Sequence, residues 1–203
     1  ELIDINKNER FWNKTVRVDY SDIFEIQETV SRDIVESLKY NLEPDETNNL
    51  SLNKSVDAAA YELFLKAKNY PTNRVSDLIT GIDLCDKSIE IDPNYAPTWA
   101  QKGSFGHLLS QASSNARYYR KLSIDAFDKA LKLDPNSLYV IRLANNFYSE
   151  LGKVEESTEM AIKSLQFGLT TEVLENVAYN CRYAGLLDHS IDIYQMAENI
   201  SQM

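Results

Sequence analysis

The sequence predicts an all-α fold in which about four helix pairs stack into a solenoid. Two amphipathic segments end alike, in Ile-Glu-Ile-Asp-Pro-Asn at 89–94 and in Leu-Lys-Leu-Asp-Pro-Asn at 131–136. Apolar and small residues also recur at a period of roughly 34 residues from about residue 57 onward. Because each amphipathic helix pair in such an array buries its apolar stripe only against a neighbour, the pairs are expected to stack into a superhelix.

Residues 1–20 precede this array and predict a β-hairpin. Apolar residues come before the turn-forming sequence Asn-Lys-Asn-Glu at 6–9, and apolar residues alternate with polar ones after it. The alternating residues are Trp12, Val16, Val18 and Tyr20. Because an isolated two-stranded hairpin is marginally stable in water, we interpret 1–20 as the remnant of a larger upstream α/β domain. An uncovered strand edge would allow a homodimer to form.

Residues 21–42 predict one long connecting helix. Asp22 and Glu25 have the spacing of a capping box, and Pro44 follows the end of the pattern. The apolar stripe recurs at steps of three and four residues and consists of Ile23, Ile26, Val30, Ile34, Leu38 and Leu42. Residues 43–56 are polar and rich in turn formers, so they predict a linker.

The repeats from 57 to 203 resemble the tetratricopeptide-repeat (TPR) family. The second repeat carries the resemblance best, through Trp99, Gly103, Gly106, Ser123, Phe127, Ala130 and Pro135. Small residues are needed where two helices cross about 8 to 10 Å apart, and Gly103 is predicted to lie against the trailing helix of its repeat. The other three repeats follow the same spacing less completely, and the second carries an insertion around 110–115.

A second resemblance concerns the start of the chain. Phe11-Trp12, the stretch 20–28 and the stretch 60–67 are similar to a bacterial architecture in which a small α/β domain of the TolB amino-terminal type leads into TPR repeats. Proteins of that layout often carry a class III nucleotide cyclase, a Ser/Thr kinase or a winged-helix regulator at the amino end. The resemblance implies a piece of a larger bacterial signalling protein.

The composition excludes several classes of function. With 31 acidic and 21 basic residues the formal charge is −10, which disfavours nucleic acid as a direct partner. No apolar run reaches the roughly 18 to 20 residues that span a bilayer, so direct membrane insertion is not expected. The two cysteines, Cys85 and Cys181, lie in helical patterns and are expected to be unpaired. We expect a cytoplasmic protein, although an anchor upstream of the segment would agree with the same data.

The sequence contains no catalytic constellation, and we expect neither an enzyme nor a bound cofactor. His107 and His189 fall in different repeats, without cysteine or carboxylate at metal-ligand spacing, so no metal site is predicted and both are expected to be exposed. No glycine-rich phosphate loop or nucleophile elbow occurs among the six glycines.

The TPR resemblance implies a binding groove lined by outward positions of each leading helix. The expected groove residues are Tyr61, Phe64, Lys68, Tyr139, Arg142, Asn146, Tyr179, Arg182 and Tyr183. Arg142 and Asn146 stand four residues apart, so their side chains share one helix face and suit a peptide carboxylate or main chain, although a solvated surface pair is the alternative. Glu172 and Glu175 stand where a carboxylate clamp would need positive charge.

The leading hypothesis is a scaffold or regulatory module that binds a peptide or helix in the groove. Its partner would be another protein or an upstream domain of the same polypeptide. The alternative is a small-molecule sensor or an enzyme with a pocket in the groove near the insertion, at 103–117. A deep pocket with convergent polar groups would favour that alternative.

Overall fold

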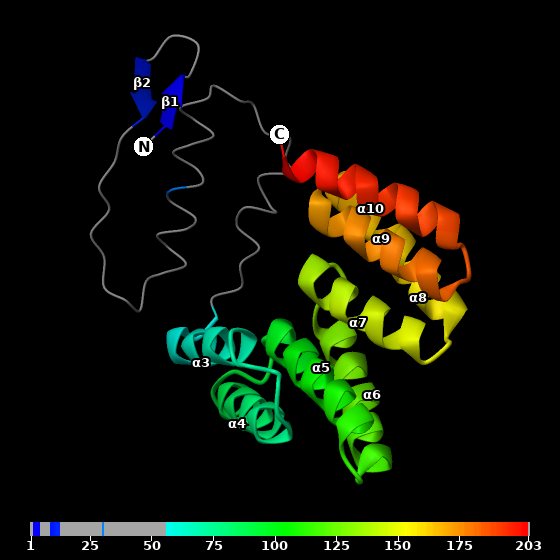
Figure 1. The fold of residues 1–203 in the computed structure, drawn as a ribbon. Coiled ribbons are helices and arrows are strands. Elements are labelled where there is room, and N and C mark those ends of the chain that lie inside the picture. The colour runs from blue at the N-terminus through cyan, green and yellow to red at the C-terminus, as the bar shows by residue number, and fades with distance from the viewer. Residues whose placement is uncertain (1, 5–8, 13–29, 31–55, 203) are drawn as a thin grey trace. The chain divides into compact units, whose positions relative to one another are not determined.

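The computed structural model describes residues 2–4, 9–12, 30 and 56–202 (Figure 1). The chain divides into two compact units, one up to Glu62 and one from Leu63 onward. The predicted linker over 43–56 and the predicted helix over 21–42 lie outside the described residues, apart from residues 30 and 56. These two assignments therefore stay predictions.

Two short strands are described near the start of the chain. Strand β1 (Leu2–Asp4) pairs with β2 (Glu9–Trp12) in antiparallel fashion, and Ile3 lies opposite Arg10 in the register. The second strand thus begins at Glu9, earlier than the alternating pattern indicated. Residues 13–20, where most of the predicted second strand falls, lie outside the described residues, so the hairpin over 1–20 stays a prediction.

The described chain from Ala58 to Ser201 is helical, which confirms the predicted all-helical repeat region (Figure 1). Its helices are α3 (Ala58–Lys68), α4 (Val75–Ile91), α5 (Ala96–Ala112), α6 (Ala116–Leu133), α7 (Leu138–Glu150), α8 (Val154–Ser164), α9 (Thr171–Tyr183) and α10 (Leu187–Ser201), with the 3₁₀ turn η2 (Leu165–Phe167) after α8.

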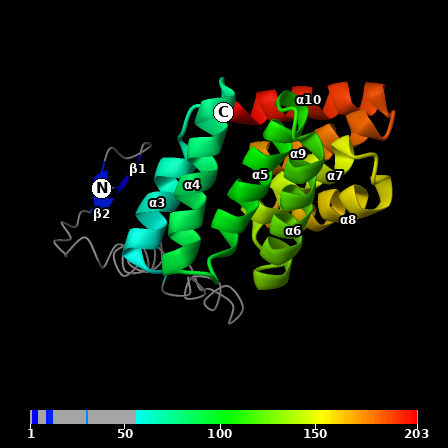
Figure 2. The same cartoon turned by 90° about the horizontal axis from the view of Figure 1, so that it is seen from below.

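The helices pack as successive pairs. Helix α5 packs on α6, α7 on α8, and α9 on α10, while the leading helices α5, α7 and α9 also contact one another in sequence. Figure 2 shows α5 and α6 side by side and α7 beside α8. Among the described residues no helix combines the length and the apolar character needed to cross a lipid bilayer.

Local sequence explains where the helices begin and end. In both Asp-Pro-Asn turns, which follow the trailing helices α4 and α6, the aspartate carboxylate accepts the amide of the asparagine two residues on, at 3.0 Å for Asp92 and 3.1 Å for Asp134. The leading helices α7 and α9 are followed instead by Gly152 and Gly185, whose φ values of 71° and 83° are left-handed conformations that favour glycine. Proline and glycine thus end different helices of the repeats.

Apolar side chains fill the space between the helices. The largest cluster joins α5, α6 and α7, with Phe127 and Phe147 buried and stacked at a ring-centroid distance of 4.9 Å. Gly103 of α5 faces the Phe127 ring of α6, which confirms its predicted place against the trailing helix. A buried amide pair ties the third repeat to the fourth, because Asn145 Nδ2 donates to the carbonyl and the side-chain oxygen of Asn176.

Candidate functional site

The groove residues predicted on α3 have different environments. Phe64 is buried, at 4% exposure, and meets the rings of Tyr95 and Tyr139 edge to face. Its expected role as an exposed groove residue is therefore corrected to packing. Lys68 is exposed, and its Nζ lies 5.2 Å from the centroid of the Tyr139 ring, within range of a cation–π contact. Tyr61 is half-buried on the same helix.

Helix α7 brings three of the predicted residues to one side. The Tyr139 hydroxyl donates to Gln101 Oε1 of α5, and burial raises the pKa of Tyr139, which keeps the hydroxyl protonated as a donor. The Arg142 guanidinium lies 3.4 Å from a carboxylate oxygen of Glu172 and 3.9 Å from one of Glu175, both on α9. These carboxylates satisfy the arginine in the absence of a partner.

Asn146 stands one turn beyond Arg142 on α7 and is half-buried. Within the described part of the chain its amide makes no side-chain hydrogen bond. An asparagine amide offers two donors and an acceptor, which is the set that a peptide main chain requires. Asn146 is thus a recognition group that the described fold leaves unused.

Helix α9 carries the three remaining predicted residues. The ring centroids of Tyr179 and Tyr183 are 5.0 Å apart, and the Arg182 guanidinium lies 5.7 Å from the centroid of the Tyr183 ring. Arg182 is exposed and Tyr183 is 41% exposed, so both present surface to solvent. The Tyr179 hydroxyl, by contrast, donates to Glu150 Oε1 of α7.

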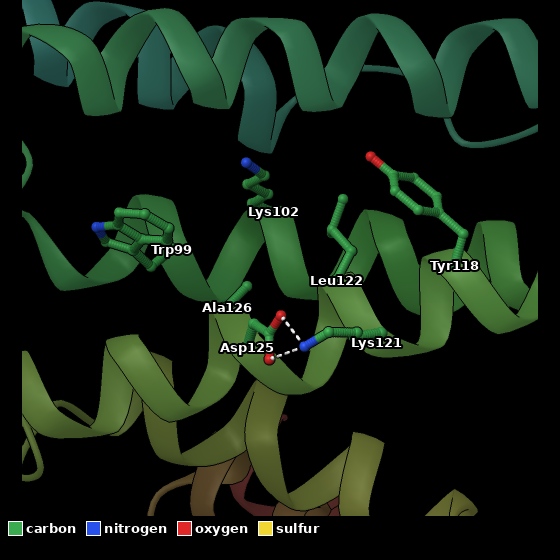
Figure 3. A pocket seen from close by; sticks show the side chains of 7 residues that line it. All are labelled: Trp99, Lys102, Tyr118, Lys121, Leu122, Asp125 and Ala126. Atoms are coloured by element: carbon green, nitrogen blue, oxygen red, sulfur yellow. Dashed lines mark hydrogen bonds and ion pairs between the residues drawn. The ribbon is translucent and has the colours of Figure 1, made fainter.

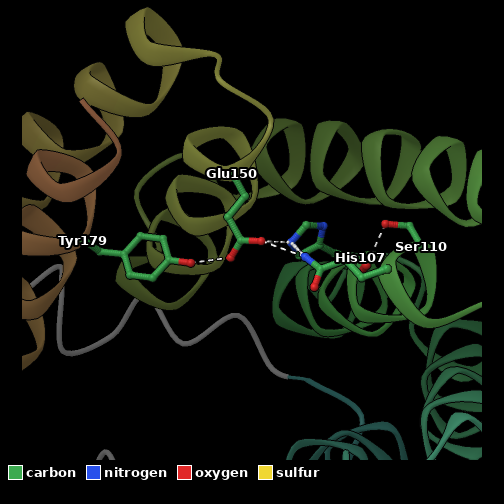
Figure 4. Close-up of polar contacts among 5 residues, drawn as sticks. His107, Ser110, Glu150 and Tyr179 are labelled. Atoms are coloured by element: carbon green, nitrogen blue, oxygen red, sulfur yellow. Dashed lines mark hydrogen bonds and ion pairs between the residues drawn. The ribbon is translucent and has the colours of Figure 1, made fainter. Parts of the chain in front are cut away.

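A polar cluster centred on Glu150 was not predicted (Figure 4). His107 Nε2 of α5 lies 2.7 Å from Glu150 Oε2, and Gln111 Nε2 donates to the same oxygen at 2.8 Å. Figure 4 shows Glu150 between the His107 ring and the Tyr179 hydroxyl, so one carboxylate links three successive leading helices. His107 is only 14% exposed in its side chain, which corrects its expected exposure, whereas His189 is exposed as expected.

The electrostatics of the cluster favour an ionised Glu150. Burial acts to raise the pKa of Glu150, but hydrogen bonds from Tyr179, His107 and Gln111 outweigh it, and the pKa is lowered from its ordinary value of 4.5. Burial, followed by the hydrogen bond to Glu150, raises the pKa of Tyr179. The sequence analysis did not connect these residues, although His107 and Glu150 both stand in the later part of successive leading helices.

The hydrogen bonds and ion pairs thus connect α5, α7 and α9 along one continuous surface. We call this surface the leading-helix face, and it consists of Gln101, His107, Gln111, Tyr139, Arg142, Asn146, Glu150, Glu172, Glu175, Tyr179, Arg182 and Tyr183. Among the described residues no group of three or more His, Cys, Asp or Glu side chains could hold a metal ion.

Two hollows lie beside α6, close to the insertion. The first, of about 280 Å³, is drawn in Figure 3 and is lined by Trp99, Lys102, Tyr118, Lys121, Leu122, Asp125 and Ala126. The second, of about 450 Å³, shares Tyr118 and Lys121 with it and adds Ser114, Asn115 and Arg117. Neither is lined by a residue of the leading-helix face. The two hollows therefore lie outside the predicted groove, and neither of them is the pocket that was predicted in the groove near 103–117.

Comparison with known proteins bears on the fold. No protein-family model matches the sequence, and no curated protein matches it. A solved TPR protein of Thermus thermophilus aligns with a TM-score of 0.59 at 12% identity, over 90% of this chain and 90% of that chain. The structure of MamA aligns with a TM-score of 0.48 at 14% identity, over 92% of this chain and 97% of that chain. The first likeness shows that this chain has a TPR fold.

Proposed function

We propose that this chain is a protein-interaction module that binds an extended peptide or a helix of a partner along the leading-helix face. The observation that carries the proposal is the continuity of this face, in which side chains from three successive leading helices contact one another. TPR folds expose long surfaces of this kind, suited to extended segments.

The composition of the face supports recognition of a protein segment. Tyr183 and Arg182 expose an aromatic ring and a guanidinium side by side, and these residue types dominate binding energy at protein interfaces. Asn146 adds an amide that no side chain engages in the described part of the chain. Because the Glu150 cluster already holds Tyr179 and His107 in place, less side-chain entropy is lost when a partner binds.

The pairs at Arg142 set the expected chemistry of the partner. Glu172 and Glu175 are 63% and 48% exposed in their side chains and share one guanidinium, so they retain capacity for a further cation. A basic side chain of the partner would meet these two carboxylates, while an acidic one would meet Arg182. A carboxylate of the partner would bind Arg142 only if it displaced both glutamates from the guanidinium.

The wider context of the module rests on the sequence. We propose the division into an upstream α/β remnant at 1–20, a connecting helix at 21–42, a linker at 43–56 and the TPR domain at 57–203. The resemblance to TolB-type layouts supports a regulatory role within a larger bacterial signalling protein. The partner would then be an upstream effector domain of the same polypeptide or a separate protein.

A displayed library of short random peptides tests the binding surface directly. We expect peptides selected on the wild-type chain to bind Asn146→Ala and Arg182→Ala at least about tenfold more weakly, because both side chains lie on the leading-helix face. Lys129→Ala on α6 is the matched control and should bind them unchanged, with helicity checked by circular dichroism. Selection of no peptide, or equal binding to all four proteins, would refute the proposal.

A further inference from the structure

We propose that helix α10 of one copy docks into the groove beside α6 of a second copy, so that the chain self-associates head to tail. This inference concerns neither the leading-helix face nor a bound peptide. It rests on the opposite charges of two helices, the basic α6 and the acidic α10, and on the shape of the surface beside α6.

Helix α6 is basic in a chain whose formal charge is −10. It contains five Lys and Arg residues and two Asp residues, and all five basic side chains are exposed. Within the part of the chain that the structure describes, Arg117 and Arg120 form no ion pair. Lys121 is engaged by Asp125 at 2.8 Å. The amino-terminal half of α6 therefore carries positive charge that the described fold leaves uncompensated.

Helix α10 has the opposite character. It contains three acidic residues and neither Lys nor Arg, and the three carboxylates are exposed. Asp188, Asp192, Met196 and Ile200 follow one another at steps of four, so they form one ridge along the helix. Met196 is 50% exposed and Ile200 is 39% exposed. Over the described residues neither aspartate of this ridge has a basic partner.

The two hollows beside α6 form a groove with the complementary order. The end near Arg117 is polar and basic, with Ser114, Asn115 and Lys121. The end near Ala126 is more apolar, with Trp99 and Leu122, although Lys102 and Asp125 also line it. Figure 3 shows Lys102, Leu122 and Tyr118 projecting toward helix α4, where Asp86 pairs with Lys102.

The dimensions of the groove and the ridge agree. The distance along α6 from Arg117 to Ala126 is about 14 Å, and the ridge from Asp188 to Ile200 is about 18 Å long. The apolar hollow, at about 280 Å³, lies at the lower limit for drug-sized ligands and suits one or two aliphatic side chains. Met196 and Ile200 would occupy it while Asp188 and Asp192 face Arg117 and its neighbours.

Two copies could associate through the same surface on each, α10 on α10 or α6 on α6, or through different surfaces, α10 on α6. The charges of the two helices favour the second arrangement. Two α10 ridges packed on each other would set Asp188 and Asp192 against the same residues if parallel, and against the apolar Met196 and Ile200 if antiparallel. Two α6 grooves would likewise set the basic end against itself or against the apolar end. Only the unlike pairing matches acid to base and apolar to apolar. Such a contact leaves one α6 and one α10 open at the ends, so association continues beyond a dimer unless a ring closes.

Sedimentation velocity over rising protein concentration tests this arrangement. The net charge opposes contact, so we expect weak association, with a Kd on the order of 10⁻⁴ M. Arg117→Glu on α6 and Asp192→Arg on α10 should each keep the chain monomeric across the range. Lys129→Glu on α6 and Glu159→Arg on α8 make matched charge changes outside the contact and should associate as the wild type does.

An equimolar mixture of the two interface variants separates this model from others. It retains one intact contact, between α10 of the Arg117→Glu copy and α6 of the Asp192→Arg copy. Its other contact sets the arginine introduced at 192 against the glutamate introduced at 117, which is again acid against base, so the mixture should associate as the wild type does. Circular dichroism confirms that each variant is folded. A monomeric wild type, a monomeric mixture, or association that only one of the two variants abolishes would overturn the proposal.

Discussion

Gly103 of α5 lies directly against the ring of Phe127 in α6, and a β-carbon on Gly103 would come within 2.9 Å of Cδ2 and Cε2 of that ring. Phe127 is fully buried and stacks on Phe147, so its ring cannot move aside at little cost. The close crossing of the two helices therefore depends on the missing side chain.

In Gly103→Ala, overpacking should cost about 1 to 3 kcal/mol of the free energy of unfolding. Because alanine gains about 1 kcal/mol over glycine in a helix interior, the net loss should be at most about 2 kcal/mol. Urea unfolding measures it, with Ser104→Ala on the same helix as the control. The double variant Gly103→Ala/Phe127→Leu should lose less than the sum of its single variants, and strict additivity would show that the two residues do not interact.

The buried amide pair between Asn145 and Asn176 should stabilise the junction of the last two repeats. Asn145→Ala would remove the side-chain donor to the carbonyl and to the side-chain oxygen of Asn176, and we expect a loss of about 1 to 3 kcal/mol in the free energy of unfolding. Asn146→Ala, one residue on and half-buried, should change it by less than about 0.5 kcal/mol. Equal effects of the two substitutions in urea unfolding would contradict this assignment.

The Glu150 cluster should make stability depend on pH. Folding lowers the pKa of Glu150 below its ordinary value of 4.5. The ionised carboxylate therefore stabilises the fold fully at pH values above the pKa of the unfolded state, and this stabilisation is lost as the pH falls through the pKa of the folded state. Glu150→Gln should lower the melting temperature at pH 7, with a cost of about 1 to 2 kcal/mol. The difference from wild type should shrink as the pH falls below 4.5 and through the lowered pKa of Glu150. Glu159→Gln, on an exposed face, should show no such dependence. A difference that stays constant with pH would count against the cluster.

Cys85 should be chemically inert in the folded chain. It is fully buried, and burial, with Asp86 adding to the effect, raises its pKa to about 12. At pH 8 only about one molecule in 10⁴ would carry the thiolate that reacts. Native labelling with iodoacetamide, followed by mass spectrometry, should modify the half-buried Cys181 first and Cys85 only after denaturation. Equal labelling rates would contradict the packing around Cys85.

Much of the repeat fold could be predicted because its signals are local. The Asp-Pro-Asn turns at Asp92 and Asp134 form through hydrogen bonds that span two residues, so the sequence alone located these helix ends. Gly103 was identified for a similar reason, since a small residue at its place in the repeat marks a helix crossing. The position of a residue on the leading helices also indicated the residues of the leading-helix face that had been predicted for the groove, namely Tyr139, Arg142, Asn146, Tyr179, Arg182 and Tyr183.

Burial and partner choice were decided only by the tertiary structure. Phe64 occupies an outward position by spacing, yet the rings of Tyr95 and Tyr139, from later in the chain, cover it. His107 has no carboxylate nearby in sequence, and its partner Glu150 lies 43 residues away on another leading helix. Helical periodicity specifies which side of its own helix a residue faces, whereas contacts between helices depend on how the repeats stack. The sequence therefore determined the helix pairs and their ends, and the stacking of those pairs decided which side chains meet.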